Sequence, residues 1–210
     1  NDDVLVIDKP AGVNADDFEK RAHRLDKDTS GILLIAKNDK ALDFLQKEFQ
    51  ERRVEKKYIA LEVGVLKNDK GEIKTLLGRS PQDRKKQKVY FLHESNIKSK
   101  REAITEYQVL QKFQNYTLIE VEIKTGRKHQ IRAQFSHIGH PIVGDIKYNA
   151  IQSFREKDVA LHAYFLQFPH PLKPKKLMTF SVDAPLNWEK RFQIDSKLIT
   201  QEALDRKKVQ

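Results

Sequence analysis

Residues 23–31 are the first segment of the sequence whose residue types could do chemistry. The segment reads His-Arg-Leu-Asp-Lys-Asp-Thr-Ser-Gly and leads directly into the apolar run 32–36. Loops at the end of a buried strand often carry catalytic side chains. The turn-forming residues 28–31 can bond to their own backbone, which leaves the carboxylate of Asp26 for a ligand. The alternative is that Asp26 is itself a turn or capping residue.

A second candidate segment, residues 125–132, reads Thr-Gly-Arg-Lys-His-Gln-Ile-Arg and predicts a turn that enters a helix. Arg132 follows His129 by three positions, so the two share one face of that helix. The guanidinium of Arg132 could pair with a carboxylate. If that carboxylate is Asp26, the pair would favour its ionised form without any metal. An exposed arginine on a helix that faces RNA is an equally good alternative.

Three histidines and an aspartate, at positions 129, 137, 140 and 145, have a spacing that could suggest a metal site. However, the end of the predicted helix near Gly139 would direct the side chains at 137 and 140 apart, and no His-Glu-x-x-His motif is present. Phosphate-binding loops, dinucleotide-binding glycine motifs and a Gly-x-Ser-x-Gly motif are also absent from the sequence. We therefore expect neither a metal nor a nucleotide cofactor.

The pattern of apolar residues predicts the elements that must position these side chains. Alternation predicts strands over 59–65, 103–113 and 119–123, in addition to short apolar strands at 4–7 and 32–36. Asn38 is a plausible N-cap for a helix through Phe49, and the spacing of Ile131, Phe135 and Ile138 predicts a second helix. We expect one α/β (α+β) domain over 1–210, with a mixed, mainly antiparallel sheet flanked by helices and loops, and a possible tail from 187.

Composition narrows the class of partner. The 210 residues include 40 Lys and Arg against 30 Asp and Glu, and no cysteine. The lack of cysteine excludes disulfides, thiolate metal sites and cysteine nucleophiles, and it suits a reducing compartment. The longest apolar run, 32–36, is far shorter than the roughly 20 residues of a membrane span. We expect a cytoplasmic protein that has no membrane partner and whose net charge of +10 attracts a polyanion.

The excess positive charge is concentrated in residues 79–101, which hold eight Lys and Arg against two acidic residues. The centre of this segment, 80–88, predicts a turn followed by a mobile basic loop. Such a loop could contact phosphates through four residues, namely Arg84, Lys85, Lys86 and Lys88. A solvated loop tip is the alternative, and charge alone does not separate the two.

Motifs in a fixed order along the chain resemble the catalytic domain of RluA-type pseudouridine synthases. They occupy residues 6–12, 23–31, 57–61, 125–132, 140–145, 161–163 and 168–171. The resemblance covers nearly the whole chain. It implies isomerisation of selected uridines in structured RNA by a monomer without cofactor or metal. Large-subunit ribosomal RNA is the expected substrate. Transfer RNA, or a non-catalytic RNA-binding module on the same fold, is the alternative.

The resemblance also implies catalytic roles. Asp26 would be the catalytic aspartate, Tyr58 would pack against the target base and act as general base, and Arg132 would pair with Asp26. The reaction needs a carboxylate that attacks the sugar or the ring and a base that removes a proton, so these residue types suit it. For Tyr58 the alternative is an ordinary sheet tyrosine whose hydroxyl reaches solvent.

The resemblance further implies RNA contacts. The target uridine must leave its helix, and Arg24 would enter the RNA stack in its place. His129 and Gln130 would order the site and contact the RNA. RNA contacts are also expected from His23 and Arg127.

Two departures from the family pattern concern the RNA-facing surface. Only residues 13–22 separate Gly12 from His23, where the family has a longer stretch. Either this is a deletion or residues are omitted from the sequence; we expect omission, because 14–17 offers no apolar anchor. No separate N-terminal RNA-binding domain is expected in this chain.

Overall fold

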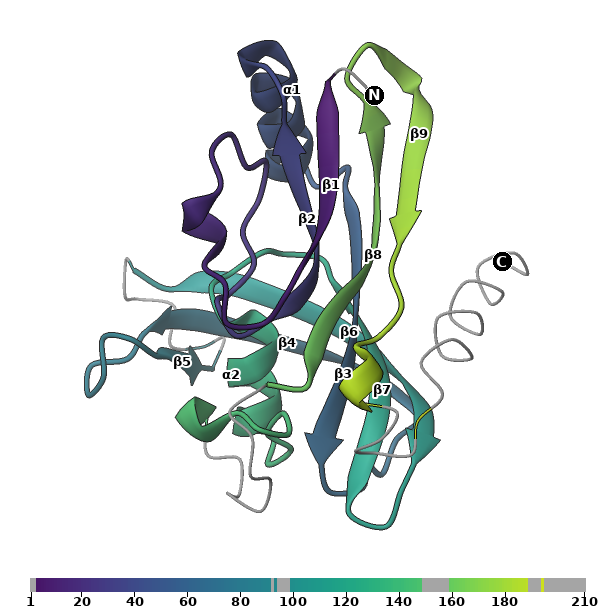
Figure 1. The fold of residues 1–210 in the computed structure, drawn as a ribbon. Helices are drawn as coiled ribbons and strands as arrows, with labels where there is room; N and C mark the ends of the chain where they lie inside the picture. Colours follow the sequence, from purple (N-terminus) through teal and green to yellow (C-terminus); the bar gives the residue numbers. More distant parts are fainter. Residues whose placement is uncertain (1–2, 92, 94–98, 149–158, 189–193, 195–210) are drawn as a thin grey trace. The chain divides into compact units, whose positions relative to one another are not determined.

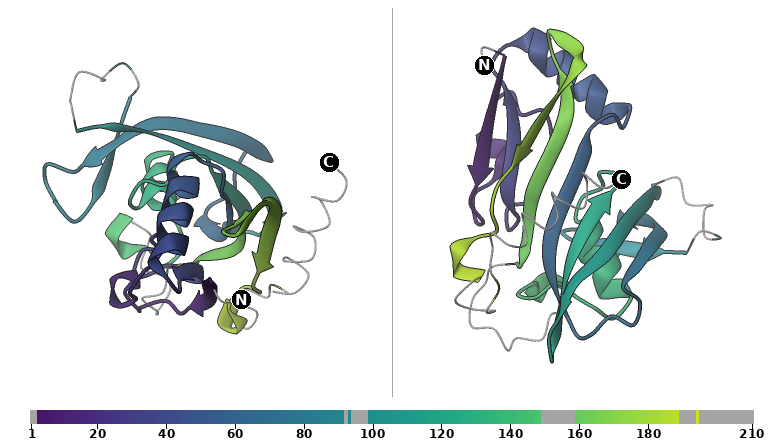
Figure 2. Two further views of the ribbon diagram at one scale, coloured as in Figure 1. Left: turned by 90° about the horizontal axis from the view of Figure 1, so that it is seen from above. Right: turned by 90° about the vertical axis from the view of Figure 1, so that its right-hand side faces the viewer.

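The computed structural model describes residues 3–91, 93, 99–148, 159–188 and 194 (Figure 1; two further views in Figure 2). Its elements in chain order are β1 (Val4–Lys9), η1 (Ala15–Asp17), β2 (Ser30–Ala36), α1 (Asp39–Gln50), β3 (Glu55–Val63), β4 (Lys70–Arg79), β5 (Gln87–Tyr90), β6 (Arg101–Lys112), β7 (Tyr116–Ile123), α2 (Gln130–His137), η3 (Ile146–Tyr148), β8 (Leu161–His170) and β9 (Lys173–Ser181). The tail predicted from 187 lies mostly outside the described residues.

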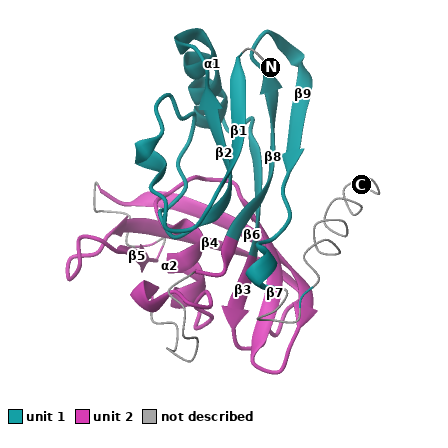
Figure 3. Ribbon diagram, viewed as in Figure 1, with its two compact units in different colours: residues 1–59, 162–210 teal, residues 60–161 magenta. Residues whose placement is uncertain are grey.

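The chain forms two compact units, which Figure 3 distinguishes by colour. Unit 1 comprises residues 1–59 and 162–210, and unit 2 comprises residues 60–161. Strands β3 and β8 each run from one unit into the other. The single domain expected from the sequence stays a prediction, because units that share strands can belong to one domain.

Unit 1 contains a mixed sheet and the helix α1. In this sheet β1 is antiparallel to β2, β8 is antiparallel to β9, and β2 and β8 are parallel where Ser30 and Gly31 face His162 and Ala163. The strands predicted at 4–7 and 32–36 are thus confirmed. Their buried side chains include Ile32 and Leu34, each of which stabilises the fold by about 1.5–3 kcal/mol.

The helix α1 begins where the sequence predicts. The side chain of Asn38 accepts a hydrogen bond from the N–H of Ala41 at 2.8 Å, and its own backbone is extended, as an N-cap requires. Ala41 and Leu45 are four residues apart and are buried in the core of unit 1 together with Phe168. Because this face of α1 is buried, the opposite face of the helix points away from the core.

Unit 2 is built on antiparallel strands in the order β7-β6-β4-β5. The strands predicted over 103–113 and 119–123 correspond to β6 and β7, joined by a turn in which the N–H of Phe113 bonds to the carbonyl of Tyr116 at 2.8 Å. The helix α2 lies against one face of these strands, where Ala133 packs with Leu77, Ala103 and Tyr148 (Figure 2).

Three local predictions need correction. Lys88 lies in β5, paired with Gly78, because the basic segment forms a hairpin turn in place of the open loop expected through 88. The end of α2 leaves Ile138 39% exposed, so it does not extend the buried stripe. Ala15 is fully buried within η1, so the segment 14–17 does have an apolar anchor.

Gly31 is required where β2 meets β8. Its φ is +110°, and a Cβ placed on it would lie 2.3 Å from the carbonyl oxygen of Ala163. Next to it, the hydroxyl of Ser30 lies 2.8 Å from Nδ1 of His162. Because backbone cannot move aside as a flexible side chain can, only glycine allows this approach.

We expect Gly31→Ala to lower the free energy of unfolding by about 3–5 kcal/mol, through backbone strain and the clash with β8. The matched control is Gly12→Ala, because Gly12 also has a positive φ of +87° but nothing within 4 Å of its Cβ position. That control should cost only about 1 kcal/mol. Urea unfolding measures both, and equal losses would contradict the contact with β8.

Candidate active site

The Asp26 turn in unit 1 is held by its main chain. The carbonyl of Asp26 accepts a hydrogen bond from the N–H of Thr29 at 3.1 Å, which closes a four-residue turn. Leu25 and Thr29 are buried on either side, and Asp26 is half-buried. The predicted turn is therefore present, and it uses the main-chain carbonyl of Asp26, not its carboxylate.

Lys9 binds the main chain of the Asp26 turn, a role that was not predicted from the sequence. Its side chain is fully buried, and Nζ donates to the carbonyls of Pro10 at 2.9 Å, Val13 at 2.9 Å and Lys27 at 3.3 Å. Burial lowers the pKa of Lys9, while the negative charges of Asp28 and Asp26 act to raise it. The carboxylates of Asp28 and Asp26 thus favour the charged form of the Lys9 ammonium.

Tyr58 lies on β3 in the same unit and is close to Asp26. Burial raises the pKa of the Tyr58 hydroxyl, and the negative charge of Asp26 raises it further. Its role as general base stays a prediction, and the side chain is only 7% exposed. The phenol is therefore neutral at neutral pH.

His23 and Arg24 differ sharply although they are adjacent. Nε2 of His23 accepts the N–H of Leu34 at 3.1 Å, and its ring stacks on Phe49 with centroids 4.8 Å apart. Burial, with the positive charge of Lys56, lowers the pKa of His23 to about 3. As a neutral ring, His23 could meet RNA by stacking or hydrogen bonding but not by charge. Arg24 is exposed, and its guanidinium pairs with none of the described residues.

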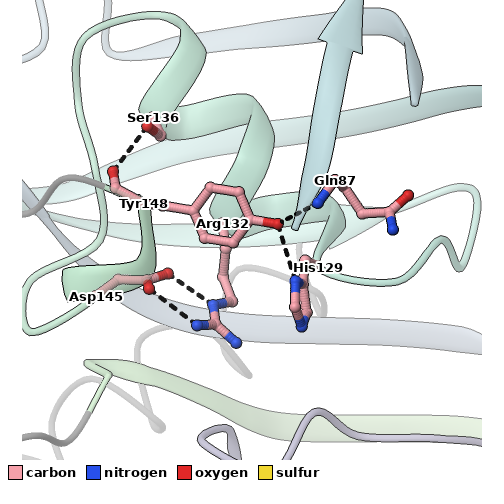
Figure 4. Close-up of polar contacts among 6 residues, drawn as sticks. All are labelled: Gln87, His129, Arg132, Ser136, Asp145 and Tyr148. Carbon is pink, nitrogen blue, oxygen red and sulfur yellow. Dashed lines mark hydrogen bonds and ion pairs between the residues drawn. The ribbon is translucent and has the colours of Figure 1, made fainter. Parts of the chain in front are cut away.

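In unit 2, Arg132 forms a buried bidentate ion pair with Asp145 (Figure 4). Nε and Nη2 of Arg132 donate to the two carboxylate oxygens of Asp145 at 2.6 and 2.9 Å, and both residues are 1% exposed. The alternative of an exposed arginine is thus wrong. Asp145 was expected only as a candidate metal ligand and as part of the motif at 140–145, so this pairing was not predicted. The predicted pairing of Arg132 with Asp26 involves residues of both units and stays a prediction.

Tyr148 connects the surroundings of this ion pair, as Figure 4 shows. Its ring lies beside the guanidinium of Arg132, and its hydroxyl accepts the N–H of Gln87 and lies 2.8 Å from Nδ1 of His129. Ser136 donates to its carbonyl at 2.8 Å. The predicted role of His129 in ordering this region therefore has a physical basis, since it links the start of α2 to η3.

Gln130 orders the turn that precedes α2. Its side-chain oxygen accepts from the hydroxyl of Thr125 at 2.8 Å and from the N–H of Arg127 at 3.0 Å, while its amide donates to the carbonyl of Ile104 at 3.0 Å. The guanidinium Nε of Arg127 donates to the carbonyl of Glu102. These bonds hold the turn against β6, and the RNA contacts expected of Gln130 and Arg127 stay predictions.

The basic hairpin turn between β4 and β5 exposes Arg84, Lys85 and Lys88. Lys86 is half-buried, and its main chain closes the turn by accepting the N–H of Ser80 and donating to the carbonyl of Asp83. Their phosphate contacts stay predictions, and Lys98 lies outside the described residues. Across the described part of the chain, no three His, Cys, Asp or Glu side chains gather as metal ligands would, and no helix is long and apolar enough to cross a membrane.

Comparison with known proteins identifies the family. A model of the family described as RNA pseudouridylate synthase matches residues 19–137, which include the Asp26 turn, Tyr58 and Arg132. The chain is 43% identical over 173 residues to an uncharacterized RNA pseudouridine synthase of Aquifex aeolicus, covering 78% of this chain and 52% of that protein. It is 35% identical over 205 residues to the ribosomal large subunit pseudouridine synthase D of Pseudomonas aeruginosa, covering 80% and 62%. The chain belongs to the RNA pseudouridylate synthase family, and it spans about half the length of the curated relatives it matches.

Solved structures confirm the fold class. The human RNA pseudouridylate synthase domain containing 1 superposes with a TM-score of 0.76 at 26% identity, covering 87% of this chain and 80% of that one. The human RNA pseudouridylate synthase domain containing 4 gives 0.74 at 23% identity, covering 93% and 92%, and supports the fold alone. The mixed α+β fold with a largely antiparallel sheet is as predicted.

We expect Asp145→Asn to destabilise the protein by about 3–5 kcal/mol, because it leaves the buried charge of Arg132 without its partner. The control is Asp69→Asn, which breaks an exposed ion pair with Lys112 in the same unit and should cost less than about 1 kcal/mol. Urea unfolding at neutral pH compares the two variants. Similar losses would show that the Arg132–Asp145 pair is not buried as described.

We expect acid to destabilise the protein partly through His23. Between its folded pKa of about 3 and its ordinary value near 6.5, only the unfolded state binds the proton, so the free energy of unfolding falls as the pH falls. The loss is about 1.4 kcal/mol per pH unit below 6.5.

Unfolding at pH 7 and pH 5 should therefore differ less for His23→Gln than for the natural protein. His137→Gln is the control, since His137 is exposed, and it should keep the full difference. A pH dependence that is unchanged in His23→Gln would contradict a neutral, buried His23.

Proposed function

We propose that this chain is the catalytic part of an RNA pseudouridine synthase that isomerises specific uridines in large-subunit ribosomal RNA. The observation that carries the proposal is the Asp26 turn, where the buried Lys9 donates to the carbonyl of Lys27 and the charge of Asp26 acts on both Lys9 and Tyr58. Relatives from Borreliella burgdorferi and Pasteurella multocida are named ribosomal large subunit pseudouridine synthase D, and they support ribosomal RNA as the substrate.

The proposed reaction begins with the carboxylate of Asp26 as nucleophile, attacking either the sugar or the uracil ring. The bond between uracil N1 and the sugar carbon breaks, the uracil turns, and its C5 forms the new bond to that carbon. The carboxylate is released, C5 loses its proton and N1 takes one up, so the product is an isomer of the substrate. Lys9 contributes by keeping the carboxylate ionised and its turn in place.

The surroundings of Tyr58 restrict its proposed role as general base. A phenol whose pKa is raised by burial and by the charge of Asp26 holds its proton at neutral pH. Bond formation by Asp26 converts the carboxylate to a neutral ester and removes that charge. A base role for Tyr58 therefore requires that C5 lose its proton before the carboxylate is released, which is possible only if Asp26 attacks the uracil ring and not the sugar. Otherwise Tyr58 acts by packing against the base.

The proposed RNA binding depends on positively charged side chains, both near the Asp26 turn and in the β4–β5 turn. Taking a uridine out of a helix costs a few kcal/mol, which phosphate contacts and an inserted side chain can offset. Arg24 is exposed two positions before Asp26 and pairs with none of the described residues, so it is suited to that insertion. The exposed cations of the β4–β5 turn are the proposed phosphate contacts.

The proposal includes a cytoplasmic enzyme that acts as a monomer. A chain without cysteine suits a reducing compartment, and Lys9, Asp26 and Tyr58 all come from one unit of one chain.

We expect Asp26→Asn to abolish the release of tritium from large-subunit ribosomal RNA labelled at uridine C5, with a loss of about a thousandfold or more. The control is Asp17→Asn, an exposed aspartate of the neighbouring η1, which should retain full activity. Filter binding should show that Asp26→Asn still binds the RNA. Full activity of Asp26→Asn would contradict the mechanism, and RNA binding by the natural protein without tritium release would favour the non-catalytic module.

A further inference from the structure

A groove in unit 1 lies between the segment that leads into the Asp26 turn and one face of α1. Its volume is about 460 Å³, within the range of roughly 300–1,000 Å³ that ligand pockets have. Its principal lining side chains are Lys20, Arg21, His23, Arg24, Gln46 and Phe49. The catalytic chemistry described above uses none of the α1 residues.

One wall of the groove is aromatic and uncharged. The rings of His23 and Phe49 are stacked at 25°, and the bond from the Leu34 N–H to Nε2 keeps His23 neutral. Lys56 lies 5.4 Å from the centre of the Phe49 ring. Aromatic surfaces bind the faces of unpaired bases without regard to sequence, at about 1–3 kcal/mol per base.

The helix contributes amide groups to the groove. Gln46 and Gln50 both line it and lie four residues apart, so they share one face of α1. Each amide carries a donor and an acceptor, as the edge of a nucleobase does. Within the described residues, neither side chain hydrogen bonds to another group. Both remain available to a ligand.

Three further lining residues, Lys20, Arg21 and Arg24, supply positive charge. Lys20 forms an ion pair with Asp39, and Arg21 forms one with Asp16. All four of these side chains are partly exposed to solvent, by 32% or more. Ion pairs of this kind contribute about 0–1 kcal/mol, so a phosphate can exchange for the carboxylate. Arg24 also lines the groove. Its Cα can be no more than about 7 Å from that of Asp26 along the chain.

We propose that this groove binds one unstacked nucleotide of the RNA, next to the target uridine. Its base lies against Phe49 and His23 and bonds to Gln46 and Gln50, and its phosphate meets Lys20 and Arg21. The inference rests on the proposed function, because it takes Asp26 as the position of the target uridine. Insertion of Arg24 into the RNA stack would separate that uridine from its neighbour and direct the neighbour towards α1.

Photo-crosslinking tests the groove without relying on activity. We would replace Gln46 by p-benzoylphenylalanine, irradiate the complex with a large-subunit ribosomal RNA transcript and map the crosslinked nucleotide by primer extension. The control carries the same replacement at Asp43, an exposed α1 residue that does not line the groove. The expected result is a crosslink from position 46, within a few nucleotides of the modified uridine, and none from position 43.

Kinetics provide the second measurement. Losing two hydrogen bonds to the base in Gln46→Ala/Gln50→Ala should raise KM about fivefold to tenfold and leave kcat unchanged. Alanine is favourable in a helix, so the variant should fold, and Asp43→Ala should keep KM within about twofold.

The outcomes separate this inference from the proposed function. Equal crosslinking from positions 43 and 46, or an unchanged KM in the double variant, would overturn the inference that the groove binds a nucleotide. Neither result would affect the proposed formation of pseudouridine. A natural protein that forms no pseudouridine on the transcript would overturn the proposed function. A specific crosslink from position 46 would then show that the groove binds RNA but not beside a reacting uridine, which also overturns the inference.

Discussion

The buried ammonium of Lys9 is the interaction on which the candidate site depends. Moving an ammonium out of water costs several kcal/mol unless its protons find acceptors, and Lys9 meets this requirement with three main-chain carbonyls. Two of them follow β1, and the third belongs to Lys27 in the Asp26 turn. The same charge that ties these segments together also lies near the carboxylate of Asp26. The candidate nucleophile therefore lies in a turn whose main chain is bound by a buried charge.

In unit 2, too, hydrogen bonds from buried polar side chains hold the main chain in place, and these side chains include uncharged as well as charged groups. The amide of Gln134 donates to the carbonyls of Ile73 and Ala103 and to the hydroxyl of Thr75, and this fixes α2 across two strands. Gln130 does the same for the turn before the helix. With these bonds in place, Arg132 and Asp145 can be buried together as a bidentate pair. Such buried hydrogen bonds favour one arrangement of α2 and the strands, because alternatives would leave more of these polar groups unpaired.

The sequence predicted the parts of the fold that depend on local chemistry. Asn38 as a cap and the alternation in β6 and β7 are readable because the partners are close along the chain or repeat at a fixed period. The Asp26 turn was readable for the same reason. The roles of Lys9 and Asp145 could not be predicted in this way. Lys9 donates to main-chain carbonyls, and Asp145 pairs with a side chain 13 residues away, and neither contact produces a pattern in the sequence. Lys88 was misplaced because β5 has only four residues and directly follows a basic turn, so its composition does not distinguish it from that turn.

The most direct test of the account is the nucleoside composition of a large-subunit ribosomal RNA transcript before and after incubation with the natural protein. Enzymatic digestion and chromatography would measure uridine and pseudouridine separately. The account predicts that pseudouridine appears in an amount equal to the uridine lost, at a defined position of the RNA. An RNA that is bound by the protein and yet keeps an unchanged nucleoside composition would contradict it.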